Sequence, residues 1–384
     1  MYNKIEKIAV IGKGKMGSDI FYHLLSYNFS LSWICRSKDD VSVLTNDVQK
    51  KLKKMLRLET ITQEQHDNAL KNLCISTELS YLKDCDLIIE TIIEDMNEKQ
   101  KIFNELTNIV RDNCILATNT SSIHLKEVFK NCTNKKRCFG LHFFYPIKFI
   151  QTVEINLMKE SDEEIAGILK DLVLNVGKKP LILQEEANFI LNKIYTVLLG
   201  DVYNIYEDRF LGMKELEDYF KTTFFPFGLF NIVNSTGTKI IVTSISNYMT
   251  DRYRAHFTPL YNKSVLLMNN NYLGGASGKG IIEYEVEHEV GCDFNKVDDI
   301  DLYKQDLLFR VIALLYNEMS YIIQQGWASK DDINYAIQDL FGLSESILTV
   351  ASKFGHEKIT KKLTECYNIK KYEVFKPINI SLID

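Results

Sequence analysis

The chain has 384 residues, which is enough for two or three domains that each bury a hydrophobic core. Hydrophobic residues make up 46% of the chain and charged residues 25%, a composition that excludes a disordered or fibrous protein. The formal net charge of −5 argues against a general nucleic-acid-binding protein, although a local basic patch can still hold an anionic ligand.

The cysteines and the hydropathy pattern narrow the class of protein further. The eight cysteines show no CxxC or Cys/His ligand spacing, so we expect neither a disulfide framework nor a metal site. The N-terminus carries no signal-type segment, and no apolar run approaches the roughly 20 residues needed to cross a bilayer. The sequence therefore predicts a cytoplasmic, enzyme-like chain that does not span a membrane.

Short β-branched runs alternate with helix-length segments from residue 6 to about 144. Runs expected to form strands lie at 7–12, 31–35, 86–92, 114–119 and 137–144, with two more at 152–155 and 180–183. Segments such as 16–27 and 97–112 have helical length and spacing of apolar residues. This alternation predicts an α/β fold with a Rossmann-type, doubly wound parallel sheet.

The first predicted strand runs into a glycine-rich loop that opens a helix. Its sequence, Gly12-Lys13-Gly14-Lys15-Met16-Gly17, has the GxGxxG spacing in the strand-to-helix context where that motif binds dinucleotides. Gly12 permits a tight turn, Gly14 lets the backbone approach a pyrophosphate, and Gly17 allows close packing of helix on strand. We expect Gly12, Gly14, Met16 and Gly17 to bind a nicotinamide coenzyme, with its phosphates at the helix N-terminus.

The end of the second predicted strand bears on which coenzyme is used. The acidic residue that commonly binds the ribose is missing there, and Arg36 and Ser37 stand in its place. A guanidinium and a hydroxyl can hold a 2′-phosphate, so NADP is favoured and NAD stays possible. Alternatively, Arg36 stacks on adenine or points into solvent, and the nearby Asp39 and Asp40 weaken the positive field.

From Glu186 to the C-terminus, helical patterns dominate and a faint internal repeat is present. The segment from Leu191 resembles the segment from Leu308, with Asp201 aligned to Glu318 at an offset of 117 residues. We therefore predict a coenzyme-binding domain at 1–186, a helical domain at 187–284 and a degenerate second helical copy at 285–384. A chance match between two amphipathic helices is the alternative.

Four segments together resemble the 3-hydroxyacyl-CoA dehydrogenase family. They are ETIIEDMNEK at 90–99, ATNTSSIHL at 117–125, GLHFFYPIKFIQTVEI at 140–155 and a Phe-Ile-x-Asn helix start at 189–192. The resemblance covers residues 5 to about 284 well and the remainder more loosely. It implies a reversible oxidoreductase of fatty acid metabolism that acts on (S)-3-hydroxyacyl and 3-oxoacyl thioesters.

The resemblance also implies roles for particular residues. His142 would be the general acid/base and Glu154 its carboxylate partner, while Ser121 and Asn192 would hold the reacting oxygen and the imidazole. An imidazole, with an ordinary pKa of about 6.5, suits proton transfer in both directions at neutral pH. Without its companions, any one of the seven histidines would more often be a surface or core residue.

Further binding residues follow from the same resemblance. Glu94 and Lys99 match family positions near the nicotinamide ribose and the thioester. The basic run at 50–57, with Lys51 and Lys54, lies where the family places a helical arm over the coenzyme A nucleotide. A solvated helix face is the alternative interpretation of that run.

The sequence departs from the family pattern at two positions. Tyr145 replaces the asparagine of the His-Phe-Phe-Asn-Pro motif, and Ala276 replaces a lysine expected in the turn at 274–280. The change at Tyr145 puts the shape of the local pocket in doubt and points to a specialised substrate, whereas Lys279 can substitute for the lysine missing at Ala276.

The main hypothesis is an NAD(P)-linked 3-hydroxyacyl-CoA dehydrogenase that takes its thioester on coenzyme A or, alternatively, on an acyl carrier protein. Oxidation of a free sugar acid by a related fold and a catalytically silent nucleotide-binding scaffold are the competing hypotheses. Since a covalent second helical copy can bury the face that short relatives use to dimerise, we expect a monomer or a weak homodimer.

Overall fold

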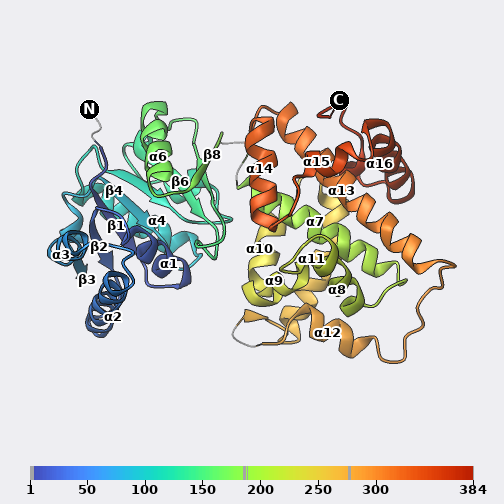
Figure 1. Cartoon of the computed structure of the whole chain (residues 1–384), viewed down its shortest axis with the longest axis horizontal. Coiled ribbons are helices and arrows are strands. Elements are labelled where there is room, and N and C mark those ends of the chain that lie inside the picture. Colours follow the sequence, from blue (N-terminus) through green and yellow to red (C-terminus); the bar gives the residue numbers. More distant parts are fainter. Residues whose placement is uncertain (1–3, 185–186, 188, 276–277, 384) are drawn as a thin grey trace. The chain divides into compact units, whose positions relative to one another are not determined.

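The computed structural model describes residues 4–184, 187, 189–275 and 278–383, which divide into two compact units at 1–189 and 190–384 (Figure 1). The domain boundary predicted at residue 186 and the departure at Ala276 lie outside the described residues. No helix within the described ranges is both long enough and apolar enough to cross a membrane.

The first unit is built on a sheet with the strand order β3-β2-β1-β4-β5-β6-β7-β8. The strands are β1 Lys7–Ile11, β2 Ser30–Ile34, β3 Cys74–Ser76, β4 Leu87–Glu90, β5 Ile115–Thr118, β6 Cys138–Phe143, β7 Thr152–Asn156 and β8 Lys179–Leu183. This confirms the predicted doubly wound α/β fold and adds β3, which the sequence did not predict.

One pair of neighbouring strands in this sheet is antiparallel. The pairs from β3 to β6 are parallel, but β7 pairs antiparallel with β6, and β8 is then parallel to β7. The link at 144–151 is too short for the helical crossover that a parallel return needs, so the chain reverses direction. The strands predicted between residues 6 and 144 are thus parallel, and the reversal comes only at β7, for which no direction was predicted.

Helices cover both faces of the sheet. They are α1 Lys15–Leu24, α2 Lys38–Arg57, α3 Gln63–Lys71, α4 Met96–Ile109, α5 Leu125–Val128 and α6 Glu163–Asn175, with short 3₁₀ turns at Leu79–Leu82 and Lys135–Arg137. One core contains Phe21, Leu52 and Leu169 from α1, α2 and α6, and the other contains Phe103 and Val128 from α4 and α5. The central strands β4 and β5 are buried at every position, as a sheet covered on both faces requires.

The second unit is helical. Its helices are α7 Ile190–Glu207, α8 Met213–Thr223, α9 Leu229–Thr236, α10 Thr238–Tyr248, α11 Arg254–Asn269, α12 Ile281–His288, α13 Ile300–Gln324, α14 Lys330–Phe341, α15 Ile347–Ser352 and α16 His356–Lys370, with a 3₁₀ turn at Glu373–Phe375. The long helices α7 and α13 are buried along most of their length and pack against each other. Helix α14 starts directly after Ser329, whose side chain caps it.

Helix starts in this unit recur at a nearly constant spacing. Helix α14 begins 117 residues after α8, while α15 and α16 each begin 118 residues after α9 and α10. Gly237 and Gly355, which precede α10 and α16, both have positive φ angles, of 104° and 85°. This spacing favours the duplication predicted from the sequence, which stays a prediction.

A buried ion pair joins α7 to α13. The guanidinium of Arg310 donates to both carboxylate oxygens of Asp201, through Nη2 at 2.6 Å and Nε at 3.1 Å. The Asp201 side chain is fully buried and that of Arg310 is 10% exposed. The two charges therefore depend on each other, because little water reaches either of them.

Candidate active site

The glycine-rich loop between β1 and α1 has the geometry of a phosphate cradle. Gly12 has φ +112°, and a side chain at Gly17 would come within 2.3 Å of the Gly12 carbonyl oxygen. At Gly14, by contrast, an added Cβ would meet no atom of the described residues within 4 Å. Two glycines thus allow tight packing while the third leaves open space beside the start of α1, which fits a dinucleotide pyrophosphate.

The corner at the end of β2 holds the residues that bear on coenzyme choice. Arg36 is exposed, and the Oγ of Ser37 accepts a hydrogen bond from the Asp40 backbone N–H at 3.3 Å as the N-cap of α2. Lys13, from the glycine-rich loop, forms an ion pair with Asp40, and its hydrogen bond lowers the pKa of that carboxyl. At the predicted 2′-phosphate site, Lys13 therefore has a carboxylate partner, and Arg36 is an exposed cation.

His142 and Glu154 face each other on adjacent strands. They are directly opposite in the antiparallel register of β6 and β7, and His142 Nδ1 lies 2.8 Å from Glu154 Oε2. The histidine side chain is 5% exposed and that of the glutamate is fully buried. Because the carboxylate engages Nδ1, the imidazole is oriented to exchange a proton through Nε2.

Aromatic rings hold the imidazole from the sides. The ring of Phe144 lies 4.3 Å from that of His142 between centroids, and the ring of Phe189 lies edge-on at 5.4 Å. This packing restricts the rotamers of His142, so the hydrogen bond to Glu154 is held in one orientation.

The turn that carries Ser121 is held by the carboxylate of Glu94. Glu94 Oε1 accepts hydrogen bonds from Thr120 Oγ1 at 2.6 Å, from the Ser121 backbone N–H at 3.1 Å, and from Ser122 N–H and Oγ at 3.2 and 2.9 Å. Burial alone raises the pKa of Glu94, but Lys99 and these donors outweigh burial and hold the pKa below its ordinary value. Glu94 therefore stays ionised and positions the turn.

A buried charge network supports this carboxylate. Lys99 Nζ lies 2.8 Å from Glu90 Oε1 and 3.4 Å from Glu94 Oε2, and its side chain is 1% exposed. Thr118 Oγ1 donates to the other Glu90 oxygen at 2.6 Å. Lys99 is thus a buried cation that pairs with both Glu90 and Glu94. Direct contact of Lys99 with a coenzyme stays a prediction.

Asn119 links the same turn to the strand of the histidine, a contact that sequence reasoning missed. Its Oδ1 accepts a hydrogen bond from the Phe143 backbone N–H at 2.8 Å, one residue after His142. The Asn-Thr-Ser-Ser motif was the available signal, but only Ser121 was selected from it. The network from Glu94 to Asn119 connects the Ser121 turn to the His142 strand.

The remaining predicted residues lie elsewhere. Lys51 and Lys54 are exposed on α2, and the Lys51 ammonium lies 5.7 Å from the centre of the Tyr22 ring. Asn192 lies in the first turn of α7 in the second unit, where its backbone carbonyl accepts a hydrogen bond from Thr196. The predicted roles of these three residues stay predictions.

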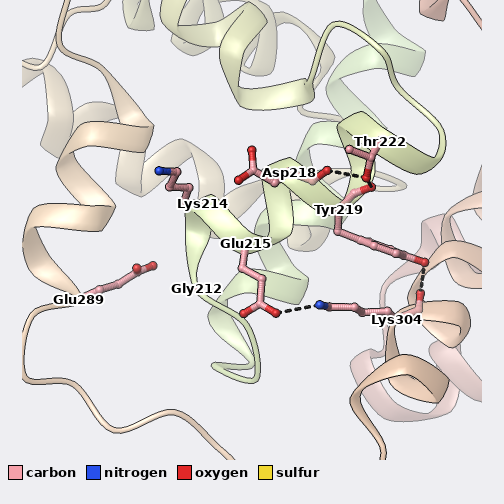
Figure 2. A pocket seen from close by; sticks show the side chains of 8 residues that line it. All are labelled: Gly212, Lys214, Glu215, Asp218, Tyr219, Thr222, Glu289 and Lys304. Atoms are coloured by element: carbon pink, nitrogen blue, oxygen red, sulfur yellow. Dashed lines mark hydrogen bonds and ion pairs between the residues drawn. The ribbon is translucent and has the colours of Figure 1, made fainter.

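A pocket of about 670 Å³ lies in the helical unit and contains none of the predicted site residues. Figure 2 shows its lining, in which Glu215 pairs with Lys304 and Tyr219 donates to the Lys304 carbonyl oxygen. Three carboxylates and two lysines line it, so its charge does not favour an anionic ligand.

The sequence is similar to those of known dehydrogenases. A family model described as "3-hydroxyacyl-CoA dehydrogenase, NAD binding domain" matches residues 7–186. The chain is 27% identical over 283 residues to a 3-hydroxybutyryl-CoA dehydrogenase of Clostridioides difficile, covering 72% of this chain and 99% of that one.

Two solved structures share the fold. The 3-hydroxybutyryl-CoA dehydrogenase of Escherichia coli K12 superposes with a TM-score of 0.80 at 19% identity, covering 98% of this chain and 97% of that one. The (S)-3-hydroxybutyryl-CoA dehydrogenase of Ralstonia eutropha gives a TM-score of 0.64 at 22% identity, covering 72% and 98%. The first of these similarities extends over the whole helical region and the second does not.

Proposed function

The chain belongs to the 3-hydroxyacyl-CoA dehydrogenase family, and on that premise we propose that it interconverts (S)-3-hydroxyacyl and 3-oxoacyl thioesters of coenzyme A with a nicotinamide coenzyme. The observation that carries the proposal is the buried His142–Glu154 pair beside the Ser121 turn. The open space at Gly14 supports a dinucleotide as the coenzyme.

The side chains of the first unit divide the chemistry between them. In the direction of oxidation, His142 takes the hydroxyl proton of the substrate through Nε2, and Glu154 stabilises the imidazolium that results. Ser121 donates a hydrogen bond to the reacting oxygen from the turn that Glu94 holds. When bound, the oxidised nicotinamide supplies the hydride acceptor.

We expect the purified protein to reduce acetoacetyl-CoA with NADH or NADPH as the reductant. The reaction is measured as the loss of absorbance of the reduced nicotinamide. Parallel reactions with acetoacetyl thioesters of an acyl carrier protein test the alternative carrier. Turnover restricted to the carrier-protein thioester would contradict the coenzyme A proposal. Coenzyme binding without turnover of either thioester would instead identify a silent scaffold.

For the coenzyme, we propose NADP in preference to NAD, with Arg36 as the residue that contacts the 2′-phosphate. Its exposed guanidinium supports this assignment, because a charged hydrogen bond to phosphate adds affinity for one coenzyme only. The Lys13–Asp40 ion pair supplies no comparable excess charge.

Replacing Arg36 by alanine is expected to raise KM for NADPH about tenfold relative to KM for NADH, as the loss of one phosphate contact predicts. Initial-rate kinetics with both coenzymes measure this ratio. Lys71→Ala, which removes an exposed positive charge from α3, is the matched control and should leave the ratio unchanged. Equal effects of Arg36→Ala on both coenzymes would exclude the 2′-phosphate contact.

For the acyl carrier, we propose that Lys51 and Lys54 bind the nucleotide of coenzyme A. Both are exposed on a helix that is anchored in the core through Val48, Leu52 and Met55, so their charges are presented on a fixed surface. Lysine binds phosphate as a point charge, which suits the phosphates of that nucleotide.

A further inference from the structure

Lys15, the first residue of α1, stacks its ammonium group on the ring of Tyr145. The Nζ atom lies 3.7 Å from the ring centroid, within the range of a cation–π contact. Lys15 lies inside the glycine-rich loop motif, and Tyr145 lies in the link that follows the His142 strand. The contact therefore joins the coenzyme loop to the catalytic strand.

The link that carries Tyr145 is anchored to α1 and to the residue that precedes β8. The Ile147 backbone N–H donates to Asp19 Oδ2 on α1 at 2.8 Å. The buried Lys178 ammonium donates to the Ile150 carbonyl oxygen at 2.9 Å and to the Ile147 carbonyl oxygen. With these anchors, the Tyr145 ring is held beside the start of α1, although the ring itself is 46% exposed.

The charge of Lys15 is not used in an ion pair. Among the described residues, Lys13 pairs with Asp40 in the same loop, whereas no carboxylate lies within ion-pair distance of Lys15. The adjacent Gly14 leaves open space on the outside of the loop. An exposed ammonium, a helix N-terminus and open space thus meet at one point.

We propose that Lys15 binds the pyrophosphate of the coenzyme and that the Tyr145 ring holds its ammonium in place for this contact. The proposal rests on the proposed function, because the phosphate belongs to the nicotinamide coenzyme. A lysine side chain loses much rotamer freedom when it binds an anion, and stacking on a fixed ring meets part of that cost beforehand. Tyr145 is a positioning residue and Lys15 a binding residue.

Binding of ADP-ribose, measured by isothermal titration calorimetry, isolates this contact from catalysis, because the probe has the pyrophosphate but no nicotinamide. Lys15→Met is expected to weaken ADP-ribose binding about five- to tenfold and to reduce its salt dependence. Tyr145→Ala should weaken binding about twofold to fivefold, and Tyr145→Phe, which keeps the ring, should bind as the wild type does. The double variant Lys15→Met/Tyr145→Ala should bind no more weakly than Lys15→Met.

Lys148→Met is the matched control, because Lys148 is an exposed lysine of the same link. If Lys15→Met and Lys148→Met bind ADP-ribose equally well, the proposal is wrong. If Tyr145→Phe weakens binding as much as Tyr145→Ala, the ring does not position Lys15. If the wild type binds neither ADP-ribose nor NAD(P)H, the proposed function itself fails, and this outcome is distinct from the other two.

Discussion

Replacing His142 by alanine is expected to lower kcat by about 10²- to 10⁴-fold, because the variant loses the group that transfers the substrate proton. Coenzyme affinity should be retained, since the glycine-rich loop and α1 do not include this side chain. The measurement is the reduction of acetoacetyl-CoA at saturating coenzyme, together with the Kd for ADP-ribose.

Two companion variants sharpen the result. Glu154→Gln keeps the shape of the partner but removes the charge that faces Nδ1, so we expect a smaller loss of kcat, about 10²-fold, with little change in KM. His288→Ala removes an exposed histidine of α12 and should leave kcat unchanged. A His142→Ala enzyme with kcat close to that of the wild type would remove the basis of the proposed mechanism.

Replacing Asp201 by alanine is expected to lower the free energy of unfolding of the helical unit by about 3–5 kcal/mol, because it leaves the Arg310 charge buried without its partner. The chain has two tryptophans, one in each unit, so in a Trp33→Phe background the fluorescence of Trp327 reports on the helical unit during urea unfolding. The reference protein carries the same Trp33→Phe change.

The double variant Asp201→Leu/Arg310→Met separates the ion pair from the packing. Replacing both charges by apolar groups should restore most of the lost stability, since no buried charge is then unpaired. Glu345→Gln breaks the exposed pair with Lys353 and should cost less than about 1 kcal/mol. If Asp201→Ala and Glu345→Gln lower the free energy of unfolding equally, the buried ion pair stabilises the protein no more than an exposed pair does.

The sequence predicted the main strands because most of them are short apolar runs, and the central strand Leu87–Glu90 is buried at every position. It missed Cys74–Ser76, since a three-residue edge strand with one β-branched residue has no periodicity to detect. Strand β7 runs antiparallel to β6 because the link at 144–151 is short. The direction of β7 was not predicted from the length of this link.

Within the candidate site, the family motifs identify individual residues in the sequence, but they do not identify the hydrogen bonds that hold those residues in place. The contacts of Glu94 with Thr120 and Ser122 join segments that are distant in sequence, and no local pattern encodes them. Likewise, the alignment of the two helical copies pairs Asp201 with Glu318 as equivalent positions and does not predict the ion pair between Asp201 and Arg310. Such pairings arise only when the helices pack.

The antiparallel register of β6 and β7 has an evolutionary consequence. Strand pairing places His142 opposite Glu154, so the intervening link does not hold the two side chains together. Residues 145–151 of the link can therefore be exchanged while strand pairing and the Phe144 ring keep the proton-transfer pair in place. The tyrosine at position 145 is one such exchange, and libraries confined to this link offer a route to new substrate preferences without rebuilding the catalytic centre.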